Sequence, residues 1–96
     1  MITHIALFAW KEGVSDGQIA KALDDVRALK EKVPGLHDIR CGKNFSRWAE
    51  GYTHAVVVSA QDKDSLEAYR NHPDHVIVAK LIESMESKSL GVDFED

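Results

Sequence analysis

The chain has 96 residues, which is enough for one domain with a single hydrophobic core but too few for two such domains. Hydrophobic residues make up 44% of the sequence and charged residues 29%, a balance typical of globular proteins rather than disordered ones. The net charge is −4 and the basic residues are scattered, so no basic surface for nucleic acid is predicted.

The first predicted element is a strand over residues 2–10, whose two faces are both mostly apolar and should both be covered. A helix is predicted next, because Ser15 and Gln18 have the spacing of a capping box. Apolar residues then recur at helical spacing as far as Val33, where a Pro-Gly pair ends the helix.

Two strands are predicted in the middle of the chain, a weak one over residues 36–43 and a clear one over residues 53–60. A short helix over residues 65–70 follows, capped by Asp62 or Asp64. The next helix begins at Pro73, which suits a first turn, and is expected to run to about Lys88. The last strand is expected over residues 89–94.

This order, β-α-β-β-α-β with a break at Pro73, predicts a ferredoxin-like α+β fold in a single domain over residues 1–96. Its four-stranded antiparallel sheet has helices on one face only. The other face is too apolar to remain in water, so we expect a homodimer with two-fold symmetry through this open sheet face. The residues predicted there are Ile5, Leu7, Ala9, Ala55 and Val57.

Partners and location follow from what the sequence contains. No apolar run approaches the roughly 20 residues that cross a bilayer, so no membrane association is expected. The first ten residues lack the basic start and cleavage site of a signal peptide. The single cysteine, Cys41, cannot form an internal disulfide. We therefore expect a cytoplasmic protein.

The segment Tyr69–His75 is the main candidate for chemistry, because it holds a phenol and two imidazoles around a proline. Imidazole changes its charge near neutral pH, and a phenol can donate a hydrogen bond to a developing oxyanion. Helical spacing after Pro73 turns His75 inward with Val78 and Ile82.

Two strand histidines are expected to face the same space. His4 and His54 should lie beneath the helices, so that both converge with His75 and Tyr69 on one cavity where burial lowers histidine pKa values. The alternative that each is only a hydrogen-bonded core or rim residue stays open. His72 either lines the pocket or caps a helix. His72 and His75 have a spacing that resembles that of metal ligands, but no cysteine lies near them in the sequence. We therefore predict no metal site.

The sequence resembles the stress-responsive A/B barrel domain family, also called Dabb, over essentially its whole length. The family's known fold, a dimeric ferredoxin-like α+β barrel, is the fold that this resemblance implies. The segments that carry the resemblance are Ile2-Thr3-His4-Ile5-Ala6-Leu7-Phe8, Gly42-Lys43-Asn44, Gly51-Tyr52-Thr53-His54, Tyr69-x-x-His72-Pro73-x-His75 and Val92-Asp93-Phe94.

One branch of the family, the plant polyketide cyclase that makes olivetolic acid, performs a metal-free intramolecular aldol condensation. By resemblance, His75 would be catalytic with Tyr69 in support, and His4 and His54 would lie in the pocket. That cyclase has aromatic residues on its first helix, whereas this chain has Leu23 and Val26. The substrate is therefore not carried over.

These observations predict a dimer that binds a small molecule and has cofactor-free acid–base activity, like that of a cyclase or lyase. His75 would remove a proton next to a carbonyl and Tyr69 would hydrogen-bond the enolate oxygen. The residues expected to bind substrate are His4, His54, Leu23, Val26 and His72. Two alternatives stay open: a non-enzymatic stress-response or ligand-binding protein, and a heme-type monooxygenase of the same fold, which rests on fold analogy.

Overall fold

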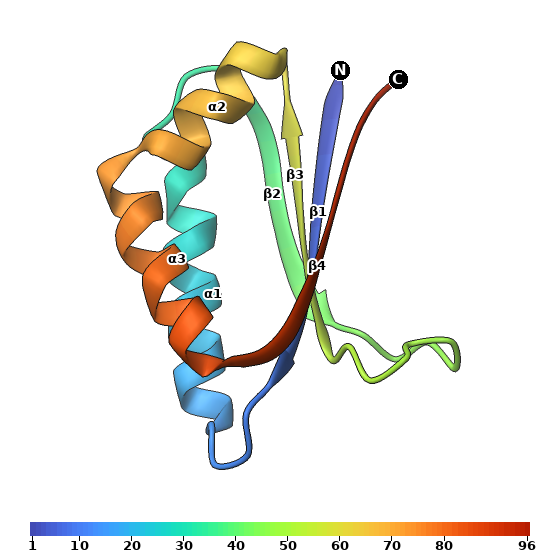
Figure 1. Cartoon of the computed structure of the whole chain (residues 1–96). Helices are drawn as coiled ribbons and strands as arrows, with labels where there is room; N and C mark the ends of the chain where they lie inside the picture. Colours follow the sequence, from blue (N-terminus) through green and yellow to red (C-terminus); the bar gives the residue numbers. More distant parts are fainter.

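One four-stranded sheet with every helix on the same side makes up the structure, a computed structural model that describes residues 1–96 (Figure 1). All neighbouring strands are antiparallel, in the order β2-β3-β1-β4. This is the ferredoxin-like α+β fold expected from the sequence. In chain order the elements are β1 (Ile2–Trp10), α1 (Asp16–Ala28), the 3-10 turn η1 (Leu29–Glu31), β2 (Leu36–Lys43), β3 (His54–Ala60), α2 (Lys63–Asn71), α3 (Pro73–Met85) and β4 (Glu86–Glu95).

The first two helices begin at side-chain caps. Gln18 N donates to Ser15 Oγ at 3.1 Å, and Ser15 N donates to Gln18 Oε1 at 2.8 Å, so the predicted capping box is confirmed. At α2, Asp62 rather than Asp64 is the cap, because its Oδ1 accepts from Ser65 N at 2.8 Å. These bonds satisfy amides that have no partner within the helix.

The helices α1 and α3 are shorter than their apolar patterns indicate, whereas α2 is slightly longer than the predicted residues 65–70. The first gives way to η1 after Ala28, and α3 ends at Met85 instead of continuing to Lys88. The reason is tertiary: residues 86–88 already pair with the end of β1, and ladder hydrogen bonds with a central strand outweigh local helix propensity. Gly35, with φ +85°, makes the turn after η1, and a Cβ there would lie 2.2 Å from Ser65 Oγ.

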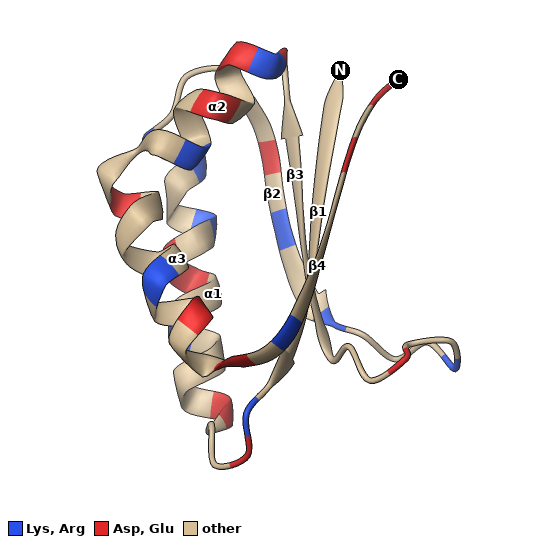
Figure 2. Cartoon of the chain, viewed as in Figure 1, with Lys and Arg blue, Asp and Glu red and all other residues tan.

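The hydrophobic core lies between the sheet and the three helices. Leu29 and Val58 are fully buried, and α3 contributes Val78 and Ile82 from its inward face. β1 and β3, the two central strands, contain no Lys, Arg, Asp or Glu, whereas the helices carry charge on their outer surfaces (Figure 2). None of the helices has the length and apolar character needed to span a membrane.

The face of the sheet that bears no helix is apolar along its middle. The antiparallel register places Val92 beside Ile5 and Leu90 beside Leu7, so β4 extends the patch predicted on β1 and β3. Leu90, Val92 and Phe94 are 47%, 42% and 46% exposed within the single chain. The predicted member Ala9 is already buried. We call the stripe formed by Ile5, Leu7, Ala55, Val57, Leu90, Val92 and Phe94 the open face.

Candidate functional site

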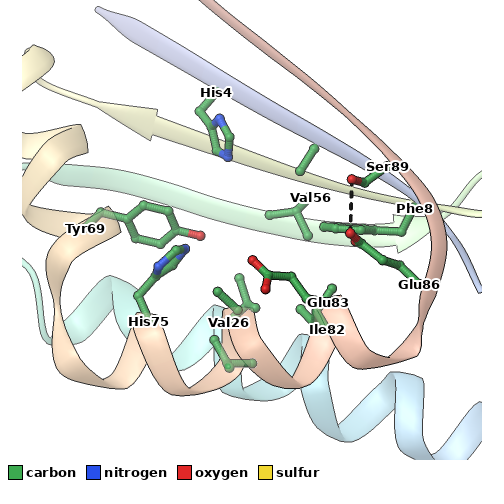
Figure 3. A pocket seen from close by; sticks show the side chains of 13 residues that line it. His4, Phe8, Val26, Val56, Tyr69, His75, Ile82, Glu83, Glu86 and Ser89 are labelled. Carbon is green, nitrogen blue, oxygen red and sulfur yellow. Dashed lines mark hydrogen bonds between the residues drawn. The ribbon is translucent and has the colours of Figure 1, made fainter.

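A cavity of about 200 Å³ lies between the sheet and α3 (Figure 3). Its more buried end is polar, its middle is apolar and its other end is acidic. The strands line it from one side, and α3, the last turn of α2 and Val26 of α1 line it from the other. The residues that line it include His4, Phe8, Val26, Val56, Tyr69, His75, Val78, Ala79, Ile82, Glu83, Glu86 and Ser89.

Tyr69 and His75 meet where α2 turns into α3. The extended backbone of His72 and the proline that follows it redirect the chain, so the end of one helix faces the start of the next. The two ring centroids are 4.5 Å apart with an interplanar angle of 59°. Tyr69 is 2% exposed, yet its hydroxyl group has no hydrogen-bond partner in the chain and points into the cavity (Figure 3). Burial raises the pKa of Tyr69 to about 12, so the hydroxyl stays protonated and can donate.

The tautomer of His75 is fixed by the main chain. Its Nδ1 lies 2.9 Å from the carbonyl oxygen of Arg70. A carbonyl only accepts, so Nδ1 carries the proton and Nε2 of the neutral ring holds the free lone pair. Burial is the largest influence on this group and lowers the pKa of His75 below its ordinary value of 6.5. The ring is therefore neutral at pH 7 and its Nε2 can act as a base.

His4 is held by a carboxylate that the sequence reasoning did not identify. The β1–β4 register sets Asp93 beside His4, and Asp93 Oδ1 lies 2.5 Å from His4 Nδ1. Asp93 Oδ2 accepts a second hydrogen bond, at 2.5 Å, from Arg70 Nη2. Burial alone would raise the pKa of Asp93, but the hydrogen bonds from Arg70 and His4 outweigh it and hold the pKa below its ordinary value.

Arg70 thus connects the two imidazoles. Its carbonyl oxygen orients His75, and its guanidinium holds the carboxylate that orients His4. Arg70 lies next to Tyr69 in the sequence, but helical spacing alone does not predict that its guanidinium contacts a residue of β4. The signal that could have found Asp93 is the alternation of β4, in which Asp93 faces the helices, read together with its pairing to β1.

His54 does not join this group, so the expected convergence of all three histidines is wrong. It pairs with Phe8, whereas His4 pairs with Val58, which puts the two imidazoles four residues apart along β1, or about 13 Å. His54 Nδ1 accepts a hydrogen bond from Trp10 Nε1 at 2.9 Å. The residue lines a separate shallow depression beside α1. Burial, followed by the charge of Lys43, lowers the pKa of His54.

The remaining predicted site residues divide between the cavity and the scaffold. Val26 lines the cavity, whereas Leu23 is a core residue that borders the depression beside His54. His72 is the N-cap of α3, because its Nδ1 accepts from Asp74 N at 3.1 Å, and it does not line the cavity. No group of three His, Cys, Asp or Glu side chains is placed to hold a metal ion.

The acidic end of the cavity was also not foreseen. Glu83 lies in the last turn of α3 and Glu86 is the first residue of β4, where Ser89 Oγ donates to Glu86 Oε1 at 3.2 Å. Glu83 is exposed and Glu86 is half-buried, so they form the mouth of the cavity. Figure 3 shows the Glu83 carboxylate pointing inward from the helix.

Comparison with known proteins gives relatives that cover the whole fold. A stress-response A/B barrel domain-containing protein of Arabidopsis thaliana is 30% identical over 98% of this chain, which spans only about half (46%) of that relative's length. Olivetolic acid cyclase of Cannabis sativa is 25% identical, over 97% of this chain and 94% of the cyclase. The crystal structure of a dimeric ferredoxin-like protein of unknown function from Thermobifida fusca superposes with a TM-score of 0.86 at 30% identity, covering 99% of this chain and 90% of that one.

The family assignment rests on nearly every residue of the chain. Residues 2–96 match the domain described as the stress responsive A/B barrel domain. The fold described above agrees with that match from β1 to β4. This chain therefore belongs to the stress-responsive A/B barrel domain family.

Proposed function

We propose that this chain forms a homodimer and binds a small carbonyl compound in the cavity, where it removes a proton next to the carbonyl without a cofactor. The observation that carries this proposal is the Tyr69 hydroxyl: its ring is buried beside His75, but the hydroxyl itself has no partner in the chain and opens onto the cavity. Buried polar groups are normally hydrogen-bonded, so an unpaired donor facing a cavity is suited to a ligand oxygen.

The proton-transfer step uses these two residues. His75 Nε2 takes the proton from the carbon next to the carbonyl, and the electron pair of that C–H bond moves onto the carbonyl oxygen. Tyr69 donates a hydrogen bond to the enolate oxygen as its charge develops. Its high pKa keeps the proton on the phenol, so the enolate is stabilised without being protonated by Tyr69.

The second half of the proposed reaction is carbon–carbon bond formation within the same molecule. The enolate carbon adds to a second carbonyl, and the proton held on His75 passes to the new alkoxide, so the imidazole returns to its neutral form. His4, oriented by Asp93 and Arg70, is a positioning residue that presents its Nε2 to the substrate. The similarity to olivetolic acid cyclase supports this class of reaction.

The homodimer forms through the open face. Its apolar side chains lie on the central strands and on β4, and about half of the surface of Phe94 and Leu90 is exposed in the single chain. Patches of this kind on a soluble protein are normally covered by a partner. The neighbour of the same fold that is described as dimeric supports the dimer, and the choice of the open face rests on its exposed apolar side chains.

Exchange of the methyl hydrogens of acetophenone for deuterium in D₂O, followed by proton NMR, tests the proposed step directly. The native protein should accelerate the exchange, and His75→Ala should slow it by about 10²–10⁴-fold, the range for a general base. His37→Ala is the matched control, because His37 is exposed on β2 and outside the cavity. No acceleration by the native protein, or equal rates in both variants, would refute the proposal.

A further inference from the structure

The inward face of α3 changes character along its length. Its cavity-lining residues are spaced i, i+3, i+4, i+7, i+8 and i+11, a single helical stripe. The stripe begins with the imidazole of His75, continues through aliphatic side chains and ends with Glu83 and Glu86. His75 and Glu83 are eight residues apart, or about 12 Å along the helix axis.

The acidic end is electrostatically unfavourable as it stands. Glu83 lies in the last turn of α3 and Glu86 is its C-cap, where the helix dipole is negative and cations are favoured instead. No basic residue lies in that turn, and no ion pair involves either carboxylate. Of the nearby cations, Lys11 Nζ donates to Ser84 O and Lys88 Nζ donates to Glu50 O. Lys80, three residues before Glu83 on α3, is exposed and forms no ion pair with either carboxylate.

The two carboxylates open onto the same cavity as the unpaired hydroxyl of the buried residue Tyr69, so they belong to a ligand site rather than to a solvated acidic surface. Carboxylates only accept hydrogen bonds. A neutral hydroxyl group would satisfy one acceptor, whereas a cation also offsets the like charges and the negative end of α3. The arrangement therefore matches a positively charged group.

On the basis of the proposed function, we propose that the substrate is a carbonyl compound that carries an ammonium group at the end opposite its carbonyl. The carbonyl lies at Tyr69 and His75. The carbon skeleton crosses the apolar middle beside Val26 and Val56, and the ammonium group lies between Glu83 and Glu86. These two carboxylates act as specificity determinants and take no part in the proton transfer.

Two isosteric probes test this assignment. The first, 4-[(dimethylamino)methyl]acetophenone, is an ammonium ion at neutral pH. The second, 4-(2-methylpropyl)acetophenone, has a CH group in place of the protonated nitrogen. Dissociation constants are measured at low ionic strength by ¹H–¹⁵N NMR titration, which also verifies the fold of each variant. The proteins compared are the native chain, the double variant Glu83→Gln/Glu86→Gln and the control Glu31→Gln/Glu50→Gln, whose substituted residues are exposed and outside the cavity.

The native protein should bind the ammonium probe about fivefold more tightly than the neutral one, the size expected for a partly exposed ion pair. The control should keep this preference, and Glu83→Gln/Glu86→Gln should lose it while its affinity for the neutral probe is unchanged. High salt should weaken the preference. Equal affinity in the native protein, or a preference that survives in the double variant, overturns the inference alone. Binding of neither probe at the cavity overturns the proposed function together with it.

Discussion

Replacing Tyr69 by Phe removes only the hydroxyl oxygen, so this substitution tests whether the hydroxyl serves the reaction or stabilises the fold. The Tyr69 ring is 2% exposed and lies 4.5 Å from His75 and 6.3 Å from His4, centroid to centroid, and all of this packing is retained by Phe. A tyrosine hydroxyl with a partner in the protein contributes about 0.5–1.5 kcal/mol to stability. Here no partner is lost, so the free energy of unfolding should change by less than about 0.5 kcal/mol.

The same substitution should have a large effect on chemistry. Loss of a single oxyanion donor typically slows a reaction by about 10²–10³-fold. Urea denaturation followed by circular dichroism gives the stability, and deuterium exchange into acetophenone gives the rate. Tyr52→Phe is the matched control, because Tyr52 lies in the loop before β3, outside the cavity. A stability loss above about 1 kcal/mol, or an unchanged rate, would show that the hydroxyl is a structural group and that the reasoning is wrong.

Two further predictions concern pH and assembly. Burial, together with the charges of His4, Arg70 and His72, holds the pKa of His75 below 6.5. The exchange rate should therefore fall at low pH with a midpoint below pH 6.5. A midpoint above that value would contradict the role of His75 as the base. Since the unfolded chain protonates this imidazole at higher pH than the folded chain, stability should fall as the pH drops through 6.5, and less steeply in His75→Ala. For assembly, Val92→Lys places a charge on the open face and should convert the dimer to a monomer in light scattering, whereas Ile77→Lys, at a 69% exposed position on the outer side of α3, should not. A native mass that stays monomeric at every concentration would exclude the dimer.

The parts of the fold that the sequence predicted well are those with short-range causes. The capping box at Ser15 needs only Gln18, and the break between α2 and α3 needs only Pro73. The clear strand over residues 54–60 needs only a run of β-branched residues. In each case the interacting groups lie within a few residues of one another, so the pattern and its physical cause appear together in the sequence.

The parts that it missed depend on how distant strands align. Periodicity places both His4 and His54 on the helix-facing side of the sheet, but only the register shows that they lie at different places along it. The same holds for Asp93, whose role requires the pairing of β4 with β1. The early start of β4 is another example, because strand pairing decided it against a helical pattern. The ends of α3 and the contents of the cavity are tertiary properties of this kind.

The two contacts of Arg70 differ in how they can change during evolution. Its guanidinium, which holds Asp93, can be deleted or shortened by a single codon change, and the carboxylate that orients His4 would then lose one of its two partners. Its carbonyl belongs to the backbone, so every amino acid at this position would supply it to His75. A substitution at this position can thus alter the sheet side of the cavity while leaving the orientation of the imidazole on α3 unchanged.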